Sequence, residues 1–128
     1  MKLPLFLTRV PAGFPLPNEG EVERYLDLNE HLIRHPAATF FVRVEGSSMQ
    51  DAGIREGDLL IVDRAKKAVD GSIVLAILNG EFNVKRLYMR ESVRLESENE
   101  AFKPIEVREE DDFEVWGVVT YVVHACTS

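Results

Sequence analysis

Cysteine is nearly absent from this chain, and long apolar runs are missing. The only cysteine is Cys126, so no internal disulfide and no cysteine-rich metal site can form. No stretch approaches the ~20 apolar residues that a membrane-spanning helix needs. The apolar run Leu3–Leu7 is interrupted by Pro4 and is shorter than the roughly 7–15 apolar residues of a signal peptide. These absences predict a cytoplasmic protein without a membrane anchor.

Positive charge is also in deficit, with 15 lysines and arginines against 22 aspartates and glutamates and a formal net charge of −7. The overall field therefore does not favour binding to nucleic-acid phosphates or to anionic lipids. The acidic cluster Glu109–Asp112 is interpreted as a solvated turn, with a docking element as the alternative. We expect protein partners, and no direct sequence-specific binding to DNA.

Histidine is scarce as well, with three in the chain. His31 and His35 are close enough to share a helix face, but no glutamate follows His31 directly and no third metal ligand is evident. His124, at the end of the last expected strand, is interpreted as structural. Cys126 has no evident base to activate it. The pattern predicts no metal, no cofactor and no Ser/His/Asp triad.

The 128 residues fit one folded domain, and an apolar share of 45% is enough for one hydrophobic core. Prolines and glycines crowd the first 20 residues, where proline restricts both its own backbone and that of its predecessor. We therefore predict a flexible, irregular or extended N-terminal arm at residues 1–20 and a folded domain at residues 21–128. The arm contains Pro4, Pro11, Gly13, Pro15, Pro17 and Gly20.

One short helix is expected after the arm. Asp27 can cap a helix over Leu28–Arg34, with Glu30 at the reciprocal position of a capping box. Pro36 prevents the helix from continuing.

Beyond this helix the apolar pattern has the period of β-strands. Phe40–Val44 alternates as a half-buried strand does, and Leu59–Val62 is a continuous apolar run of strand length. Phe113–Val123 is rich in β-branched and aromatic residues and is expected to bend near Gly117. The predicted fold class is mainly β: a compact, bent or barrel-like antiparallel sheet with one short helix.

The sharpest local signal is Asn79-Gly80, which separates Ser72–Leu78 from Glu81–Tyr88 and is typical of a two-residue hairpin turn. Counting outward from such a turn gives the register, and directly opposed residues share one face of the sheet. The expected pairs are Leu78 with Glu81, Ala76 with Asn83, Val74 with Lys85, and Ser72 with Leu87. The other face, which looks like core, carries Ile73, Leu75, Ile77, Phe82 and Val84.

This register surrounds Lys85 with aliphatic side chains. Only a neutral amine can act as a base, and about 4 in 10,000 exposed lysines are neutral at pH 7. Burial would lower the pKa of Lys85 and raise that fraction. The alternative is that Lys85 extends its ammonium to water, as most strand lysines do.

Ser48 is the candidate nucleophile. It follows the Phe40–Val44 strand in the segment Glu45–Met49, where Gly46 permits a sharp turn that exposes a hydroxyl and can aim N–H groups at an oxyanion. Taken alone, Gly-Ser-Ser is far more often an ordinary loop.

Several segments, in order, together resemble the UmuD family of translesion polymerase V accessory subunits, relatives of the self-cleaving domain of the LexA repressor (peptidase S24). The resemblance runs from about residue 10 to the last strand and implies a β-clip fold like that of LexA and signal peptidase. The matching segments are Ala12–Pro15, Asp27–Asn29, His35–Thr39, Gly46–Met49, Gly57–Asp63, Gly80–Leu87 and Val115–Val119.

The resemblance implies a serine–lysine dyad. Ser48, which precedes Met49, matches the nucleophile of the family, and Lys85 matches its general base. The backbone N–H groups of Ser47 and Ser48 would form the oxyanion site.

Ala12-Gly13 matches the self-cleavage bond of the family. A small residue followed by glycine lets the backbone approach a recessed nucleophile, and Pro11 and Pro15 keep the segment out of helix. Without the resemblance, this segment would be interpreted as an ordinary flexible arm.

By resemblance, a RecA filament on single-stranded DNA activates the cleavage in the SOS response to DNA damage. The trimmed chain, residues 13–128, would form a homodimer that assists an error-prone Y-family translesion DNA polymerase. Only 12 residues end at the bond here, fewer than in the best-known relatives.

Three alternatives remain at this stage. Signal peptidases also use a serine and a distant lysine, but they need a membrane anchor. A non-catalytic interaction module could keep the fold without the activity. A phage-repressor-like C-terminal domain is the third, disfavoured because residues 1–20 look like a natural start. LexA-type repressors carry a helix-turn-helix domain ahead of the bond, for which this chain has no room, so we expect a polymerase accessory subunit and not a repressor.

Overall fold

The computed structural model describes residues 1–6 and 22–127. The chain forms two compact units, Met1–Arg34 and His35–Ser128. The sequence placed a boundary at residues 20/21, and the peptidase domain predicted for residues 21–128 stays a prediction. Among the described residues, no helix is both long and apolar enough to cross a membrane.

The first unit pairs the start of the chain with the segment before the helix. Strand β1 (Leu3–Phe6) runs antiparallel to β2 (Val22–Leu26), with Leu3 opposite Leu26. The described part of the predicted arm is thus an extended strand.

Helix α1 (Leu28–Leu32) begins as the sequence predicts, because the Asp27 carboxylate accepts a hydrogen bond from the Asn29 N–H at 3.0 Å. It ends earlier than the expected Arg34. Ile33 already has an extended backbone (φ −111°, ψ 104°), so the helix stops at Leu32.

The second unit is built on one antiparallel sheet in the strand order β3-β4-β9-β5-β6-β7-β8. Its strands are β3 (Thr39–Arg43), β4 (Leu59–Asp63), β5 (Ile73–Leu78), β6 (Glu81–Met89), β7 (Val93–Glu96), β8 (Ile105–Glu106) and β9 (Phe113–Val123). Two short 3₁₀ turns, η1 (Pro36–Ala38) and η2 (Gln50–Ala52), flank β3. The mainly β, antiparallel fold class is confirmed.

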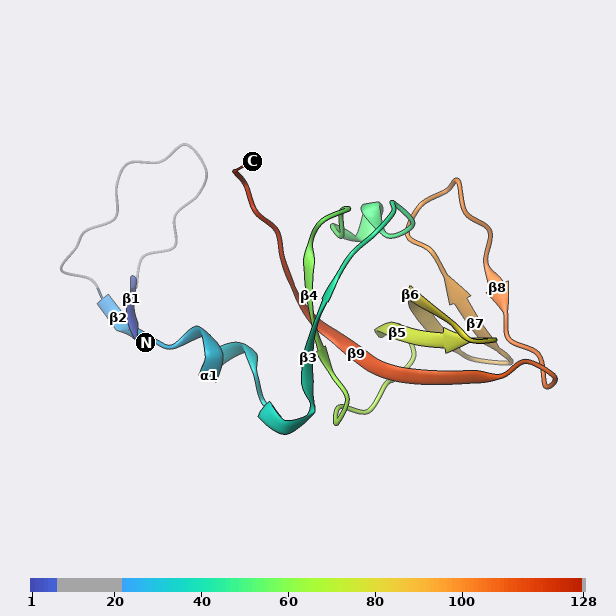
Figure 1. The fold of residues 1–128 in the computed structure, drawn as a ribbon, viewed down its shortest axis with the longest axis horizontal. Helices are drawn as coiled ribbons and strands as arrows, with labels where there is room; N and C mark the ends of the chain where they lie inside the picture. The colour runs from blue at the N-terminus through green and yellow to red at the C-terminus, as the bar shows by residue number, and fades with distance from the viewer. Residues whose placement is uncertain (7–21, 128) are drawn as a thin grey trace. The chain divides into compact units, whose positions relative to one another are not determined.

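Strand β9 joins the two halves of this sheet. Figure 1 shows it as the long strand that runs through the unit, with β3 and β4 beside one part and β5 to β8 beside the other. Its bounds are those predicted from the sequence, and its pairing with β5 shifts register opposite Gly117. A Cβ at Gly117 would lie 2.5 Å from Val62 Cγ1, so only glycine fits where β9 crosses β4.

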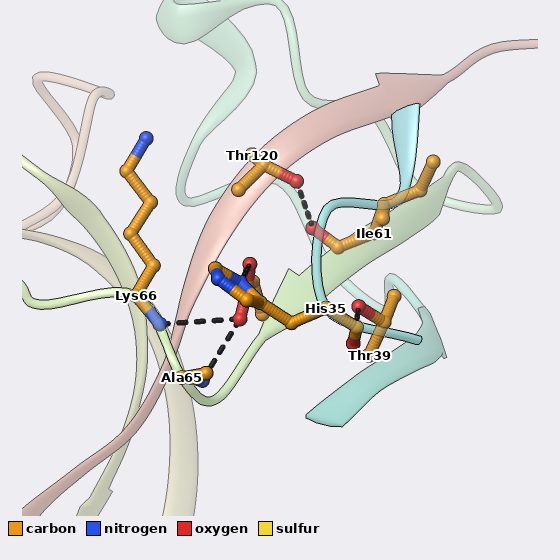
Figure 2. Close-up of polar contacts among 7 residues, drawn as sticks. His35, Thr39, Ile61, Ala65, Lys66 and Thr120 are labelled. Atoms are coloured by element: carbon orange, nitrogen blue, oxygen red, sulfur yellow. Dashed lines mark hydrogen bonds and ion pairs between the residues drawn. The ribbon is translucent and has the colours of Figure 1, made fainter. Parts of the chain in front are cut away.

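A second register shift in β9 leaves Thr120 between the pairs Val62–Val119 and Ile61–Tyr121. The Thr120 hydroxyl donates to the Ile61 carbonyl at 3.2 Å across this bulge, as Figure 2 shows. Such bulges increase the local twist and bend of a strand. They place the curvature of the sheet where β9 passes from one half to the other.

The β5–β6 hairpin has the predicted register. Asn79 and Gly80 both have positive φ (50° and 83°), as the two-residue turn requires, and Val74 lies directly opposite Lys85. The pair expected beyond the strand end is supported by a hydrogen bond from the Leu87 N–H to the Ser72 carbonyl.

Each face of the central strands packs into its own apolar cluster. One cluster contains Met49, Ile54, Leu60, Val62 and Leu75, and the other contains Val74, Ala76, Leu87, Leu95 and Val118. The second cluster lies on the Lys85 face, which is therefore as much a core as the face that the sequence favoured. Phe82, expected in the core, is 60% exposed, because it lies next to the hairpin turn; its ring packs edge-to-face with the ring of Trp116.

Candidate active site

Ser48 and Lys85, which are 37 residues apart in the chain, meet in the structure. The Lys85 Nζ lies 2.9 Å from the Ser48 Oγ, within hydrogen-bonding distance. In a flat sheet, four strand spacings would separate β3 from β6 by about 19 Å. Ser48 follows β3 and Lys85 lies on β6, so the curved sheet and the segment between Arg43 and Ser48 together bring them into contact.

Lys85 is buried among aliphatic side chains. It is 8% exposed, and the neighbours on its face of the hairpin, Val74, Ala76 and Leu87, are essentially inaccessible. This burial lowers the pKa of the Lys85 ammonium below its ordinary value. Among the described residues, no carboxylate forms an ion pair with Lys85 that would restore the charged form. The interpretation that Lys85 extends into water is wrong for this structure.

The turn that carries Ser48 is held by its neighbours. Gly46 has a φ of 88°, a conformation that favours glycine, and lets the chain turn after β3. The Met49 side chain is buried in the first apolar cluster, which fixes the turn to the core. Its carbonyl accepts hydrogen bonds from the N–H groups of Ala52 and Ile54. Ser48 itself stays partly exposed, as a nucleophile must be.

The predicted oxyanion donors are the backbone N–H groups of Ser47 and Ser48. Within the part of the chain that the structure describes, the N–H groups of Ser47 and Ser48 donate to no other group, although the Ser47 carbonyl accepts from Gln50 at 3.2 Å. Unpaired N–H groups beside the hydroxyl are what stabilisation of an oxyanion requires.

A cavity of about 320 Å³ opens beside the dyad. It lies between the end of β3 and the β5–β6 hairpin, so its lining combines a strand edge with the face that carries the base. The lining residues are Val42, Arg43, Val44, Glu45, Gly46, Ser48, Met49, Ile54, Leu75, Phe82, Asn83, Val84 and Lys85. The lining is polar and apolar in similar measure, with Arg43, Glu45 and Asn83 polar besides the dyad, and it suits an extended peptide whose backbone forms hydrogen bonds while its small or apolar side chains pack.

The predicted cleavage bond, Ala12-Gly13, lies outside the described residues. Its position relative to Ser48 therefore stays a prediction.

Two of the histidines, His35 and His124, contact buried aspartates. His31 belongs to α1, whereas His35 lies beyond the end of the helix, so the two do not share a helix face. His35 Nδ1 lies 2.6 Å from the buried Asp63 carboxylate, which also accepts from the N–H groups of Ala65 and Lys66 (Figure 2). His35 therefore ties the start of β3 to the turn after β4.

His124 makes the corresponding contact at the other end of β4. Its Nδ1 lies 2.6 Å from the carboxylate of Asp58, which is 3% exposed and also accepts from the Arg55 N–H. Burial alone would raise the pKa values of Asp58 and Asp63, but the hydrogen bonds from the backbone and from the histidines outweigh it, so both pKa values are lowered. Both pairs are structural.

The sequence reasoning did not single out Glu98, Asn99 or Phe102, which the structure brings to the dyad. Asn99 donates to the Ser47 carbonyl, and the Lys85 Nζ lies 5.9 Å from the centre of the Phe102 ring. These residues belong to the connection between β7 and β8, and no local pattern could reveal that this connection folds against the Ser48 turn.

The chain is similar to known proteins over most of its length. The family model described as Peptidase S24-like matches residues 4–120. The chain is 45% identical over 120 residues to protein MucA of Salmonella typhimurium, covering 93% of this chain and 82% of MucA. It is 47% identical over 123 residues to protein ImpA of Escherichia coli, covering 94% of this chain and 83% of ImpA. The LexA repressor of Idiomarina loihiensis is 42% identical over 123 residues, which cover 94% of this chain and 59% of the repressor.

Proposed function

Because this chain belongs to the Peptidase S24-like family, we propose that it is a self-processing serine peptidase that cleaves its own Ala12-Gly13 bond. Ser48 is the nucleophile and Lys85 is the general base. The observation that carries the proposal is the 2.9 Å separation between the Ser48 hydroxyl and a lysine whose pKa is lowered by burial. A lysine that loses its proton in apolar surroundings is a base suited to a serine hydroxyl.

The reaction follows from these positions. Neutral Lys85 accepts the proton of the Ser48 hydroxyl as Oγ attacks the Ala12 carbonyl carbon, and the N–H groups of Ser47 and Ser48 stabilise the oxyanion. The C–N bond to Gly13 then breaks, and Lys85 returns the proton to the leaving amine. Water, deprotonated by Lys85, hydrolyses the resulting Ser48 ester and releases residues 1–12 as a free acid.

The cavity and the edge of β3 suit an extended substrate. Among the described residues, strand β3 lies at the edge of the sheet and pairs with β4, so its outer edge can hydrogen-bond an added peptide strand. The cavity beside Ser48 then accommodates small or apolar side chains on either side of the bond. Because the arm is tethered, the step is effectively unimolecular, and well-oriented cases reach effective molarities of about 10⁵ M or more.

The family and the relatives support a UmuD-type function related to the SOS response. We further propose that a RecA filament on single-stranded DNA activates the cut, and that residues 13–128 then act as a homodimeric accessory subunit of a Y-family translesion polymerase. The chain spans 82% of MucA and 83% of ImpA but 59% of the LexA repressor.

The test is self-cleavage of the purified chain, followed by intact mass with and without RecA filaments on single-stranded DNA. We expect loss of residues 1–12, while Ser48→Ala and Lys85→Ala stay whole. A Ser48→Ala chain that still shortens at the same bond would exclude this nucleophile. A wild-type chain that stays whole under all conditions, with unreactive Ser48, would favour a non-catalytic interaction module.

A further inference from the structure

The connection between β7 and β8 holds the Ser48 turn on both sides of the nucleophile. On the N-terminal side, the Asn99 side-chain amide donates to the Ser47 carbonyl at 2.9 Å. On the C-terminal side, the Asp51 N–H donates to the Glu98 carbonyl at 2.7 Å. Two consecutive residues of one connection therefore bracket Ser48.

The same connection is tied to the strand of the base. The Glu98 carboxylate forms an ion pair with Arg86, which directly follows Lys85 on β6. Arg86 is fixed in turn, because its guanidinium also donates to the Gly71 carbonyl at 2.7 Å. Glu98 therefore links the Ser48 turn to β6: its carbonyl accepts from the Asp51 N–H, and its carboxylate pairs with Arg86.

Asn99 also shapes the connection itself. Its side-chain oxygen accepts from the Ala101 N–H at 3.0 Å, and its carbonyl accepts from the Phe102 N–H at 3.0 Å. This turn leads the chain to Phe102, whose ring faces the Lys85 ammonium.

We infer that Glu98 and Asn99 are positioning residues that set the distance between Ser48 and Lys85, an inference that rests on the proposed peptidase function. The contacts given for these two residues are to neighbours of the dyad, so each acts through a neighbour. The Asn99 side chain acts through Ser47. Glu98 acts through Asp51 with its backbone carbonyl and through Arg86 with its carboxylate. A misplacement of about 1 Å can slow a reaction by about 100-fold, so a held turn matters to the rate.

Asn99→Asp separates the two roles of the Asn99 side chain. The aspartate keeps an oxygen for the Ala101 N–H but replaces the amide donor with a second oxygen facing the Ser47 carbonyl. Glu98→Gln keeps the shape of Glu98 and its backbone contact to Asp51 but removes the charge that faces Arg86. The matched control is Asp70→Asn. The Asp70 carboxylate accepts hydrogen bonds from the Met89 N–H at the end of β6 and from Arg90, the next residue, and the substitution weakens them.

Two rates are measured from pH 6 to 11: self-cleavage, and labelling of Ser48 by a fluorophosphonate, which does not need the arm. We expect Asn99→Asp to lower the high-pH plateau of both rates by about 10- to 100-fold, and Glu98→Gln by a smaller factor. Asp70→Asn should leave both plateaus within about twofold of wild type at a similar loss in melting temperature.

The pH profile distinguishes positioning from charge. If Asn99→Asp acted only by stabilising the Lys85 ammonium, the profile would move to higher pH and reach the wild-type plateau. That result, or wild-type plateaus in both variants, would overturn the inference while leaving the peptidase intact. A wild-type chain that neither cleaves nor labels would instead overturn the proposed function, and the inference with it.

Discussion

Val74 lies directly across the β5–β6 ladder from Lys85, and it is fully buried. Directly opposed side chains of an antiparallel pair are the closest neighbours on a sheet face. The branched side chain of Val74 therefore lies beside the Lys85 side chain on the buried face of the hairpin, and the burial of Lys85 lowers its pKa. The hairpin register is thus part of the catalytic chemistry that we propose.

The rate of self-cleavage should rise with pH and level off below the pH at which an ordinary lysine loses its proton. Only neutral Lys85 accepts the proton of Ser48, so the midpoint reports the pKa of Lys85 in the folded chain. Val74→Thr, which has a similar shape but adds a hydroxyl, should move the midpoint to higher pH. The measurement is intact mass over time from pH 6 to 11; a rate independent of pH over this range would contradict a lysine base.

Lys85→Met should abolish cleavage and stabilise the folded chain at neutral pH, by about 0.5–2 kcal/mol. The folded-state pKa of Lys85 is lowered, so the unfolded chain binds more protons than the folded chain between the two pKa values. The penalty of holding Lys85 is therefore full below the folded-state pKa and disappears as the pH rises toward the unfolded value. Urea unfolding at pH 7 and at pH 11 should show the gain of Lys85→Met shrinking at the higher pH; an equal gain at both would indicate better packing alone.

Gly117→Ala should destabilise the second unit by about 1–3 kcal/mol, because the new methyl group meets Val62 Cγ1 at 2.5 Å. Val62 is fully buried and stiff at χ1, so it cannot easily move aside. Val62→Ala leaves a cavity that the methyl group introduced by Gly117→Ala can fill. The double variant should therefore lose less free energy of unfolding than the two single variants lose in sum. Thermal unfolding of the four chains completes the cycle; strict additivity would show that the two positions do not compete for space.

Asp58→Asn and Asp63→Asn should each lower stability at pH 7 by about 1–3 kcal/mol, since each loses a buried carboxylate that accepts several hydrogen bonds. Both aspartates have lowered folded-state pKa values, so their contribution is complete above the pKa of an unfolded aspartate, about 3.9. It is lost as the pH falls through the folded-state values. Acid unfolding should therefore be shallower in the variants than in wild type.

Asp51→Asn is the control for this pair, because Asp51 is exposed. Its acid unfolding should follow that of wild type. If Asp58→Asn and Asp63→Asn also unfold in acid with the wild-type slope, other carboxylates dominate the acid transition.

The local elements and one strand register follow from the order of the amino acids alone. Asn79-Gly80 demands a turn with two positive φ values, and the strict period of two in a strand then fixes which residues share a face with Lys85. The Asp27 cap and the bounds of β9 followed from equally local rules. The turn, the register, the helix cap and the strand bounds depend on residues only a few positions apart in the sequence. The resemblance to a family, carried by short segments in order, then supplied Ser48 as the partner of Lys85.

Which distant segments meet depends on how the whole chain packs. Nothing local brings Ser48 to within 2.9 Å of Lys85, because three other strands lie between β3, which precedes Ser48, and β6, which carries Lys85. The bracket made by Glu98 and Asn99 depends on the same closure, since their connection contacts the Ser48 turn across 47 or more residues of chain. Phe82 was misjudged for the related reason that the period of a strand gives the face of a residue, whereas its burial depends on what packs there. Long-range packing is set by the summed burial of the whole core, so it has no signature in any single segment.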